Sequence, residues 1–171
     1  MKKVLLALAG LAFATSISVA QDVVSFIHGT VKKVDKATKT IVVKTADGTE
    51  HTVKVAGDDA VKGTKDGLNG IKEGSQVVVS ETGKGADETA KAVGKVGKDG
   101  MKVTKGTIVN LDEGTKTVVV KSADGTEKTF EYTGTALEDS GKAVGKGTEK
   151  GAKVTVYYTE DAGKKIAHFF E

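Results

Sequence analysis

The sequence contains no cysteine, so the fold cannot depend on disulfide bonds and no thiolate is present to bind a metal or attack a substrate. It also contains no arginine, because all 26 basic residues are lysines. Arginine is the side chain that holds phosphate groups and guanine edges with paired hydrogen bonds. Its absence weighs against specific recognition of nucleic acid. Aromatic residues are scarce, at 5% of the chain, which limits the surfaces on which bases or sugars could stack.

Long hydrophobic runs are absent except at the N-terminus. Lys2 and Lys3 precede an apolar stretch that ends with small residues before Ala20, a pattern typical of a secretory signal. A membrane-spanning helix needs about 20 apolar residues, and polar residues from Thr15 onward interrupt the run too early. We therefore predict a signal peptide at residues 1–20 and a periplasmic or secreted protein, with no membrane insertion after its removal. Loss of the two lysines lowers the net charge from +3 to +1.

The sequence does contain an internal repeat. Gly29–Val55 and Gly106–Tyr132 lie 77 residues apart and are identical at 15 of 27 positions. The same register continues without a gap to the end of each copy. Because a fixed period of this kind indicates duplicated structural units, we predict two domains, at residues 21–97 and 98–171.

Each copy begins with a pattern of β-strands. Thr40–Thr45 and Glu50–Val55 alternate apolar and polar residues, and the Asp47-Gly48 pair between them predicts a hairpin turn. The first strand, Val23–Val34, departs from alternation because its two core valines are three positions apart. A β-bulge would place both on the same side, and the second copy repeats the irregularity.

The remainder of each copy predicts a crossover followed by two strands. Asp58–Lys72 shows near-helical apolar spacing but carries three glycines, each costing about 1 kcal/mol in a helix interior. We therefore predict a short, poorly stabilised helix within an irregular connection. Gly94–Gly100 is the candidate linker, and its shortness predicts that the domains touch. The other expected elements are strands at 76–81 and 89–93. In the second copy the crossover is expected at 135–150 and the two strands at 153–158 and 165–169.

Three strands, a crossover and two further strands, with a bent first strand, is the order of a five-stranded oligonucleotide/oligosaccharide-binding (OB) barrel. Closure of a barrel also removes the exposed edges of such short strands. The predicted fold is therefore all-β, with two tandem five-stranded OB-like barrels, each with a short helix or irregular crossover between its third and fourth strands. Each unit is small, so packing of one on the other is expected to add stability.

A family resemblance follows from these turn and core positions. The first copy carries G-T-V-x-x-V-D-x-x-x-x-T-x-x-V-x-x-x-D-G-x-x-x-T-x-x-V, followed by L-x-x-I-x-x-G-x-x-V-x-V at Leu68–Val79. This pattern resembles a family of exported bacterial tandem small β-barrel domains of unknown function. The second half, with GTEKGAKVTVYYTEDAGKKIAHFFE, is similar to the C-terminal half of its tandem members. The resemblance covers Phe26–Glu171 and implies the fold and an envelope location. It brings no activity and no catalytic residues.

The residues that could carry chemistry are scattered. His28, His51 and His168 form no close sequence cluster, and lysine replaces the first two in the other copy. We therefore interpret them as strand residues that face solvent or are half buried, and we predict neither a metal nor another cofactor. Asp47 and Asp35 are interpreted as turn residues. No serine lies in a recognised nucleophile motif, so we predict that the protein is not an enzyme.

The aromatic residues of the second copy are the exception. Where the first copy has serine, alanine and valine, the second has Tyr157, Phe169 and Phe170. Because neighbouring strand residues face opposite ways, we predict that Tyr157 and one of the two phenylalanines lie outside the second barrel's core. They would form an interaction surface toward the first domain or a partner chain.

The sequence therefore predicts a non-enzymatic exported binding or structural module of the envelope. Its partner would be a protein or another envelope component, without specific nucleic-acid binding. The alternative is a periplasmic binder of a small ligand, a glycan or a metal ion, at the barrel face of the second domain. The sequence leaves the partner and the oligomeric state open.

Overall fold

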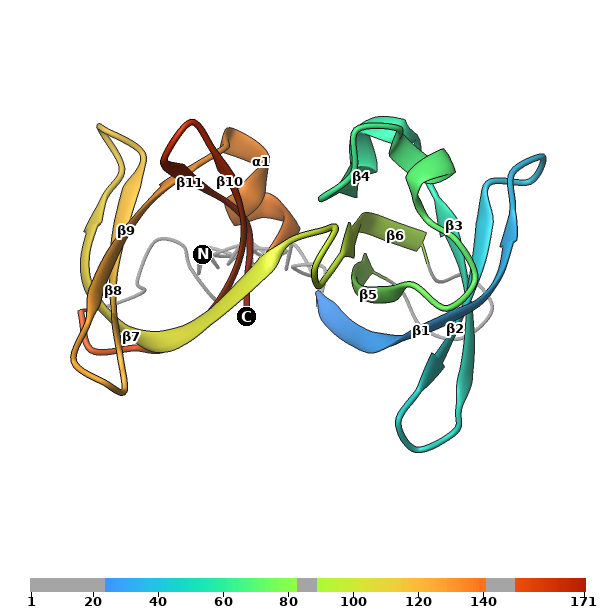
Figure 1. The fold of residues 1–171 in the computed structure, drawn as a ribbon, viewed down its shortest axis with the longest axis horizontal. Helices are drawn as coiled ribbons and strands as arrows, with labels where there is room; N and C mark the ends of the chain where they lie inside the picture. The colour runs from blue at the N-terminus through green and yellow to red at the C-terminus, as the bar shows by residue number, and fades with distance from the viewer. Residues whose placement is uncertain (1–23, 83–88, 141–149) are drawn as a thin grey trace, which may run out of the picture.

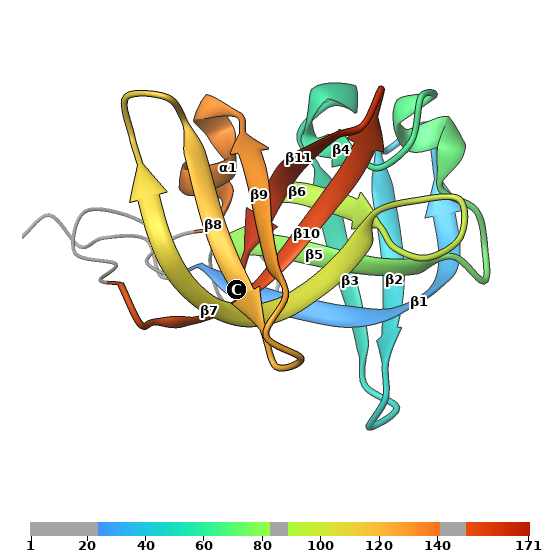
Figure 2. The same ribbon diagram turned by 60° about the vertical axis from the view of Figure 1, so that its left-hand side comes forward.

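The computed structural model describes residues 24–82, 89–140 and 150–171, which form two small barrels side by side (Figures 1 and 2). In the first barrel the strands are paired in the order β3-β2-β1-β5-β6, and a short parallel pairing of β3 with β6 closes the ring. A two-residue strand, β4 (Val61–Lys62), pairs in parallel with the end of β6. The principal strands are β1 (Ser25–Asp35), β2 (Thr40–Thr45), β3 (Glu50–Val55), β5 (Gln76–Thr82) and β6 (Thr89–Lys95).

The second barrel repeats this arrangement, closing in the order β10-β11-β9-β8-β7. The predicted all-β fold with two closed five-stranded barrels in tandem is thus confirmed. The predicted signal peptide, residues 1–20, and the loop at 83–88 fall outside the described residues. Within the described part of the chain, no helix is long and apolar enough to cross a membrane. The strands are β7 (Lys102–Asp112), β8 (Thr117–Ser122), β9 (Glu127–Tyr132), β10 (Lys153–Asp161) and β11 (Lys164–Phe170).

The predicted bulge in the first strand is present in both barrels. The pairing of β1 with β2 shifts register between Val31 and Lys33, and that of β7 with β8 shifts between Ile108 and Asn110. The extra residue turns Val31 into the core and lets Val34 pack against it. β1 can therefore pair with β5 through its first half and with β2 through its second half.

The Asp-Gly turns have the conformation that their residue types favour. Gly48 and Gly125 lie at φ of 92° and 84°, a region open to glycine without a steric penalty. In the first turn the carboxylate Oδ1 of Asp47 accepts a hydrogen bond from the backbone N–H of Thr49 at 3.1 Å. Asp124 does the same for Thr126 at 2.9 Å. The two turns are therefore structurally equivalent.

Replacing Gly48 or Gly125 with valine is expected to lower the free energy of unfolding by about 1 kcal/mol or more in each case. A Cβ at either position meets nothing within 4 Å, so the cost comes from backbone strain alone. Urea denaturation of the two variants measures the effect. Variants that both unfold like the parent would contradict the hairpin assignment.

The crossovers differ between the two copies. In the first barrel two 3₁₀ turns, Asp58–Ala60 and Gly67–Gly70, flank β4. Gly63 and Gly67 have φ of 75° and 52°, which interrupts any continuous helix. The second copy has a short helix, α1 (Gly134–Asp139), after which residues 141–149 lie outside the described part of the chain. The sequence predicted a weak helix in each irregular connection, and among the described residues an α-helix is present in the second copy but not in the first.

Each barrel has its own apolar core. The second core holds larger side chains, because Phe130 and Tyr132 replace Val53 and Val55 at equivalent positions of the third strand. Phe130 packs edge-on against Tyr158, with ring centroids 4.9 Å apart. Both cores add residues of their crossovers, Ala60, Leu68 and Ile71 in the first and Ala136 and Leu137 in the second. Two separate cores explain how two small units can each fold without a disulfide.

Candidate functional site

A third apolar cluster lies between the barrels. β5 and β6 of the first barrel face β10 and β11 of the second, and Met101 enters from the connection between them. Phe26 and Val96 cover the edge of the cluster. The predicted contact between the domains is therefore present. The buried members are Val78, Ala92, Met101, Tyr157 and Phe169.

This contact joins equivalent faces of the two copies, with side chains of complementary size. Tyr157 and Phe169 occupy the repeat positions of Ser80 and Ala92. Large residues of the second copy thus fit against small residues of the first. A Cβ on Gly94 would overlap Cε of Met101 and lie 2.6 Å from Cε2 of Phe169, so glycine makes room for both side chains.

Gly94 was predicted to begin a linker, and that assignment is wrong. Gly94 and Lys95 are paired with Val78 and Val77 as the last residues of β6. The glycine is buried because the side chains of Met101 and Phe169 lie over it, a role that the local sequence could not reveal. The connection itself is the tight turn at 97–100, which returns the chain to Met101.

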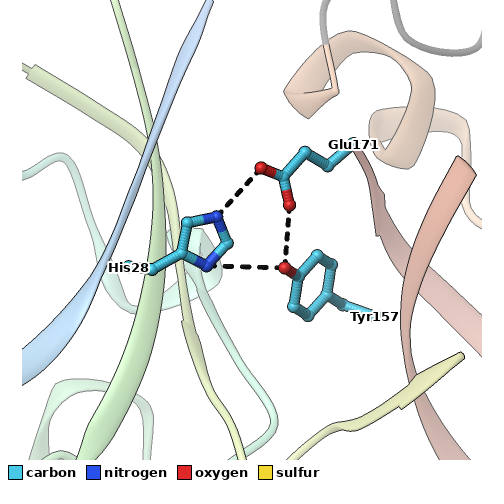
Figure 3. A network of polar contacts seen from close by, with 3 residues as sticks. All are labelled: His28, Tyr157 and Glu171. Atoms are coloured by element: carbon cyan, nitrogen blue, oxygen red, sulfur yellow. Dashed lines mark hydrogen bonds and ion pairs between the residues drawn. The ribbon is translucent and has the colours of Figure 1, made fainter. Parts of the chain in front are cut away.

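A polar network crosses the same interface (Figure 3). The Tyr157 hydroxyl donates to Oε2 of Glu171 at 2.9 Å, and 3.4 Å separates it from Nδ1 of His28 on β1. His28 Nε2 lies 3.0 Å from the other carboxylate oxygen of Glu171. Farther along the interface the Ser80 hydroxyl donates to the backbone carbonyl of Asp139. These contacts fix the relative orientation of the barrels, because hydrogen bonds need specific directions.

The network keeps the Tyr157 phenol protonated. Burial raises its pKa above the ordinary value, and the hydrogen bond to Glu171 and the charge of that carboxylate act in the same direction. Tyr157 therefore acts as a hydrogen-bond donor at neutral pH and cannot serve as a base. Glu171 in turn receives one contact from each barrel.

The three residues of the predicted interaction surface separate into two groups. Tyr157 and Phe169 lie together in the cluster between the barrels, with ring centroids 6.3 Å apart. Phe170 faces the opposite way and belongs to the second core, where it packs edge-on against Tyr132. Phe170 is therefore not part of an interaction surface. Its neighbour Phe169 takes the outward position because a β-strand alternates its faces.

The two barrels also carry equivalent grooves on their outer surfaces. The groove of the second barrel has a volume of about 530 Å³ and lies over β7, β8 and β10. That of the first has about 480 Å³ and lies over β1, β2 and β5. Thr107 and Lys121 in one groove occupy the repeat positions of Thr30 and Lys44 in the other. No motif in the sequence predicted these grooves, because the residues that line them follow the ordinary pattern of exposed strand positions.

A third and larger space opens at another edge of the interface. Its volume is about 880 Å³, with walls from the first crossover and from the β10–β11 hairpin. His168 lies on its wall, with Nε2 2.8 Å from the Thr159 hydroxyl. Burial, and to a lesser extent the charge of Lys62, lowers the pKa of His168 to about 4. His168 is therefore neutral at physiological pH.

This neutral state predicts a pH dependence of stability. The unfolded chain binds a proton at His168 near pH 6.5, whereas the folded chain does so only near pH 4. The contribution of His168 is thus fully present above pH 6.5 and is lost as the pH falls toward 4, by about 3 kcal/mol in all. His168→Gln should reduce the change in unfolding free energy between pH 7 and pH 4.5 by about 2 kcal/mol, the part of this loss that falls in that range. An unchanged difference would show that His168 titrates normally.

The histidines do not converge. His28 lies on β1 at the network, His51 is half buried on β3, and His168 lies on β11. Among the described residues, no group of three or more histidine, aspartate or glutamate side chains is arranged to hold a metal ion. Asp35 is a turn residue, as predicted, because its carboxylate accepts hydrogen bonds from the backbone N–H groups of Ala37 and Thr38.

Fold and interface together define a tandem pair of closed five-stranded barrels joined through equivalent faces. No protein-family model matches the chain, and neither does any curated protein sequence. Among solved structures, the chain is similar to the one titled "Crystal structure of Ag(I)CusF", with 18% identity over 43% of this chain and 97% of that chain, at a TM-score of 0.33. Similarity at this level carries no argument about function.

Proposed function

We propose that this protein is a non-enzymatic, exported binding module of the cell envelope in which the two barrels act as one rigid unit. The observation that supports it is the fit of Tyr157 and Phe169 against the small residues of the equivalent face. A contact of this kind holds two copies of one surface at a fixed spacing. Fixed spacing raises the effective concentration of the second copy once the first has bound.

The arrangement of polar groups supports a role without catalysis. A nucleophilic mechanism needs a nucleophile beside a base that a third group orients. Of His28, Tyr157 and Glu171, only Tyr157 carries a hydroxyl; its pKa is raised and its proton is donated to Glu171. The network thus uses its hydrogen bonds to join the barrels.

The proposal is tested by sedimentation with an insoluble bacterial cell-envelope fraction. The parent protein should sediment with the fraction and release no soluble fragments from it. Phe169→Ala, which disrupts the fit between the barrels, should bind at least tenfold more weakly while both barrels stay folded. Failure of the parent to bind would refute the binding role, equal binding of the variant would refute the rigid unit, and released fragments would indicate an enzyme.

Export is tested separately. If residues 1–20 form a signal peptide, protein recovered from the periplasm or medium should begin at Gln21 and be soluble. Intact-mass measurement decides this, because the mature chain lacks the mass of the first 20 residues. Recovered protein that retains those residues, or that partitions into detergent, would contradict export by this route.

The second candidate is a periplasmic binder of a small glycan or metal ion at the face of the second barrel. The groove over β7, β8 and β10 favours the glycan, because threonine, serine and lysine side chains line it. Such a ligand should raise the melting temperature by mass action. A module that binds only a large envelope component would show no such shift with small glycans.

A further inference from the structure

The outer grooves of the two barrels share an unusual excess of positive charge. Lys105, Lys121 and Lys153 line the groove of the second barrel, and Glu171 is its one acidic residue. The first groove contains Lys32 and Lys44 and no acidic residue. With the predicted signal removed, the chain as a whole has a net charge of only +1, so this concentration of lysines is local.

Two lysines of the second groove flank the side chain of Thr107. In the pairing of the strands, Lys153 and Lys121 lie directly opposite Thr107 on either side. Glu127 lies opposite Lys121 on the next strand, yet these two described residues form no ion pair. Neighbouring ammonium groups repel one another, so an anion placed between them would be favoured.

The two grooves meet at the interface between the barrels. His28 lines the first groove and Glu171 the second, and their side chains are 3.0 Å apart. The carboxylate of Glu171 is occupied by His28 and Tyr157, so it opposes an incoming anion less than a free carboxylate would. β1 and β7, which carry the two grooves, run along the same side of the molecule (Figures 1 and 2).

We propose that the two grooves together bind one extended anionic polysaccharide, whose carboxylates contact the lysines and whose hydroxyls contact threonine and serine. This inference rests on the proposed binding function and names its ligand class. Lys44 and Thr30 in the first groove, at the repeat positions of Lys121 and Thr107, supply a second set of the same contacts. A repeating polymer is the ligand that can match a repeated site.

The composition of the grooves favours a polysaccharide over nucleic acid. Single-stranded nucleic acids bind largely by stacking of bases on aromatic side chains. Among the described residues that line the two grooves there is no phenylalanine or tyrosine. The grooves offer hydroxyl groups and ammonium groups, which match the donors and acceptors of an acidic sugar.

The test uses the mature protein and polygalacturonate, with its methyl-esterified form as the uncharged control. Calorimetric titration at low salt should show binding of the acidic polymer that weakens steeply as salt is added, because ammonium–carboxylate contacts release counterions. The esterified polymer should not bind. Single-stranded DNA of similar charge should bind at least tenfold more weakly than polygalacturonate.

The variant K105Q/K121Q/K153Q should lose at least tenfold in affinity, and adding K32Q and K44Q should abolish binding. The matched control is K36Q/K54Q/K150Q, which removes three exposed lysines outside both grooves and should bind like the parent. Melting temperatures confirm that each variant is folded, since exposed substitutions of this kind change stability little.

Three results would overturn the inference: no binding of polygalacturonate, equal loss in the groove and control variants, or DNA binding as tight as that of the polysaccharide. None of these would by itself contradict the proposed function, which fails only if the parent does not bind the envelope fraction. Retention by that fraction, with unchanged binding of the groove variants, would place the ligand site elsewhere on the rigid unit.

Discussion

Replacement of Phe169 by alanine is expected to lower the free energy of unfolding by about 3 kcal/mol and to let the two barrels unfold separately. The Phe169 ring is fully buried, but it packs between the barrels, against Met101 and over Gly94. Its loss leaves a cavity between two units whose own cores are intact. Urea denaturation followed by a signal from each barrel should therefore change from one transition to two.

Phe170→Ala is the matched control, because it removes the same side chain from the adjacent, equally buried position. Phe170 lies in the core of the second barrel, so its loss should unfold that barrel and leave the first largely unaffected. The two variants should thus show similar losses of stability and different patterns of unfolding. Identical patterns would mean that the barrels do not have separate cores.

Tyr157→Ser is the second substitution with a large expected effect, because it restores the residue that the first copy has at this position. The change removes a ring that is 5% exposed and the hydroxyl that links His28 with Glu171. The coupling between the barrels should weaken by about 2 to 3 kcal/mol, with both barrels still folded. Hydrogen exchange should show faster exchange on β5 and β10 at the interface, while the strands remote from it keep their protection.

Tyr157→Phe separates the two contributions to that effect. This variant keeps the ring in the apolar cluster and removes only the hydroxyl, so it should cost about 1 kcal/mol. A larger cost would indicate that the polar network dominates the contact. If Tyr157→Ser instead unfolded the second barrel, Tyr157 would be a residue of that barrel's own core.

The sequence alone determined the architecture of this protein, and the reason is that most of its signals are local. Alternation in Thr40–Thr45, the Asp47-Gly48 turn and the irregular spacing at Val31 and Val34 each depend on residues near in the chain. Because the two copies share these patterns, each local prediction held for both domains. Parity along a strand was also sufficient to place Phe169 and Phe170 on opposite faces.

The tertiary structure decided the contacts between residues that are distant in sequence. Gly94 was predicted to be a linker glycine because nothing near it in the chain shows that the ring of Phe169 lies over it. His28 and Glu171 are 143 positions apart, and only the packing of one barrel on the other makes them neighbours. The grooves likewise arise from exposed residues of three strands that pairing places side by side. A local pattern can determine on which face of a strand a side chain lies, but it contains no information on which distant residue packs against that face.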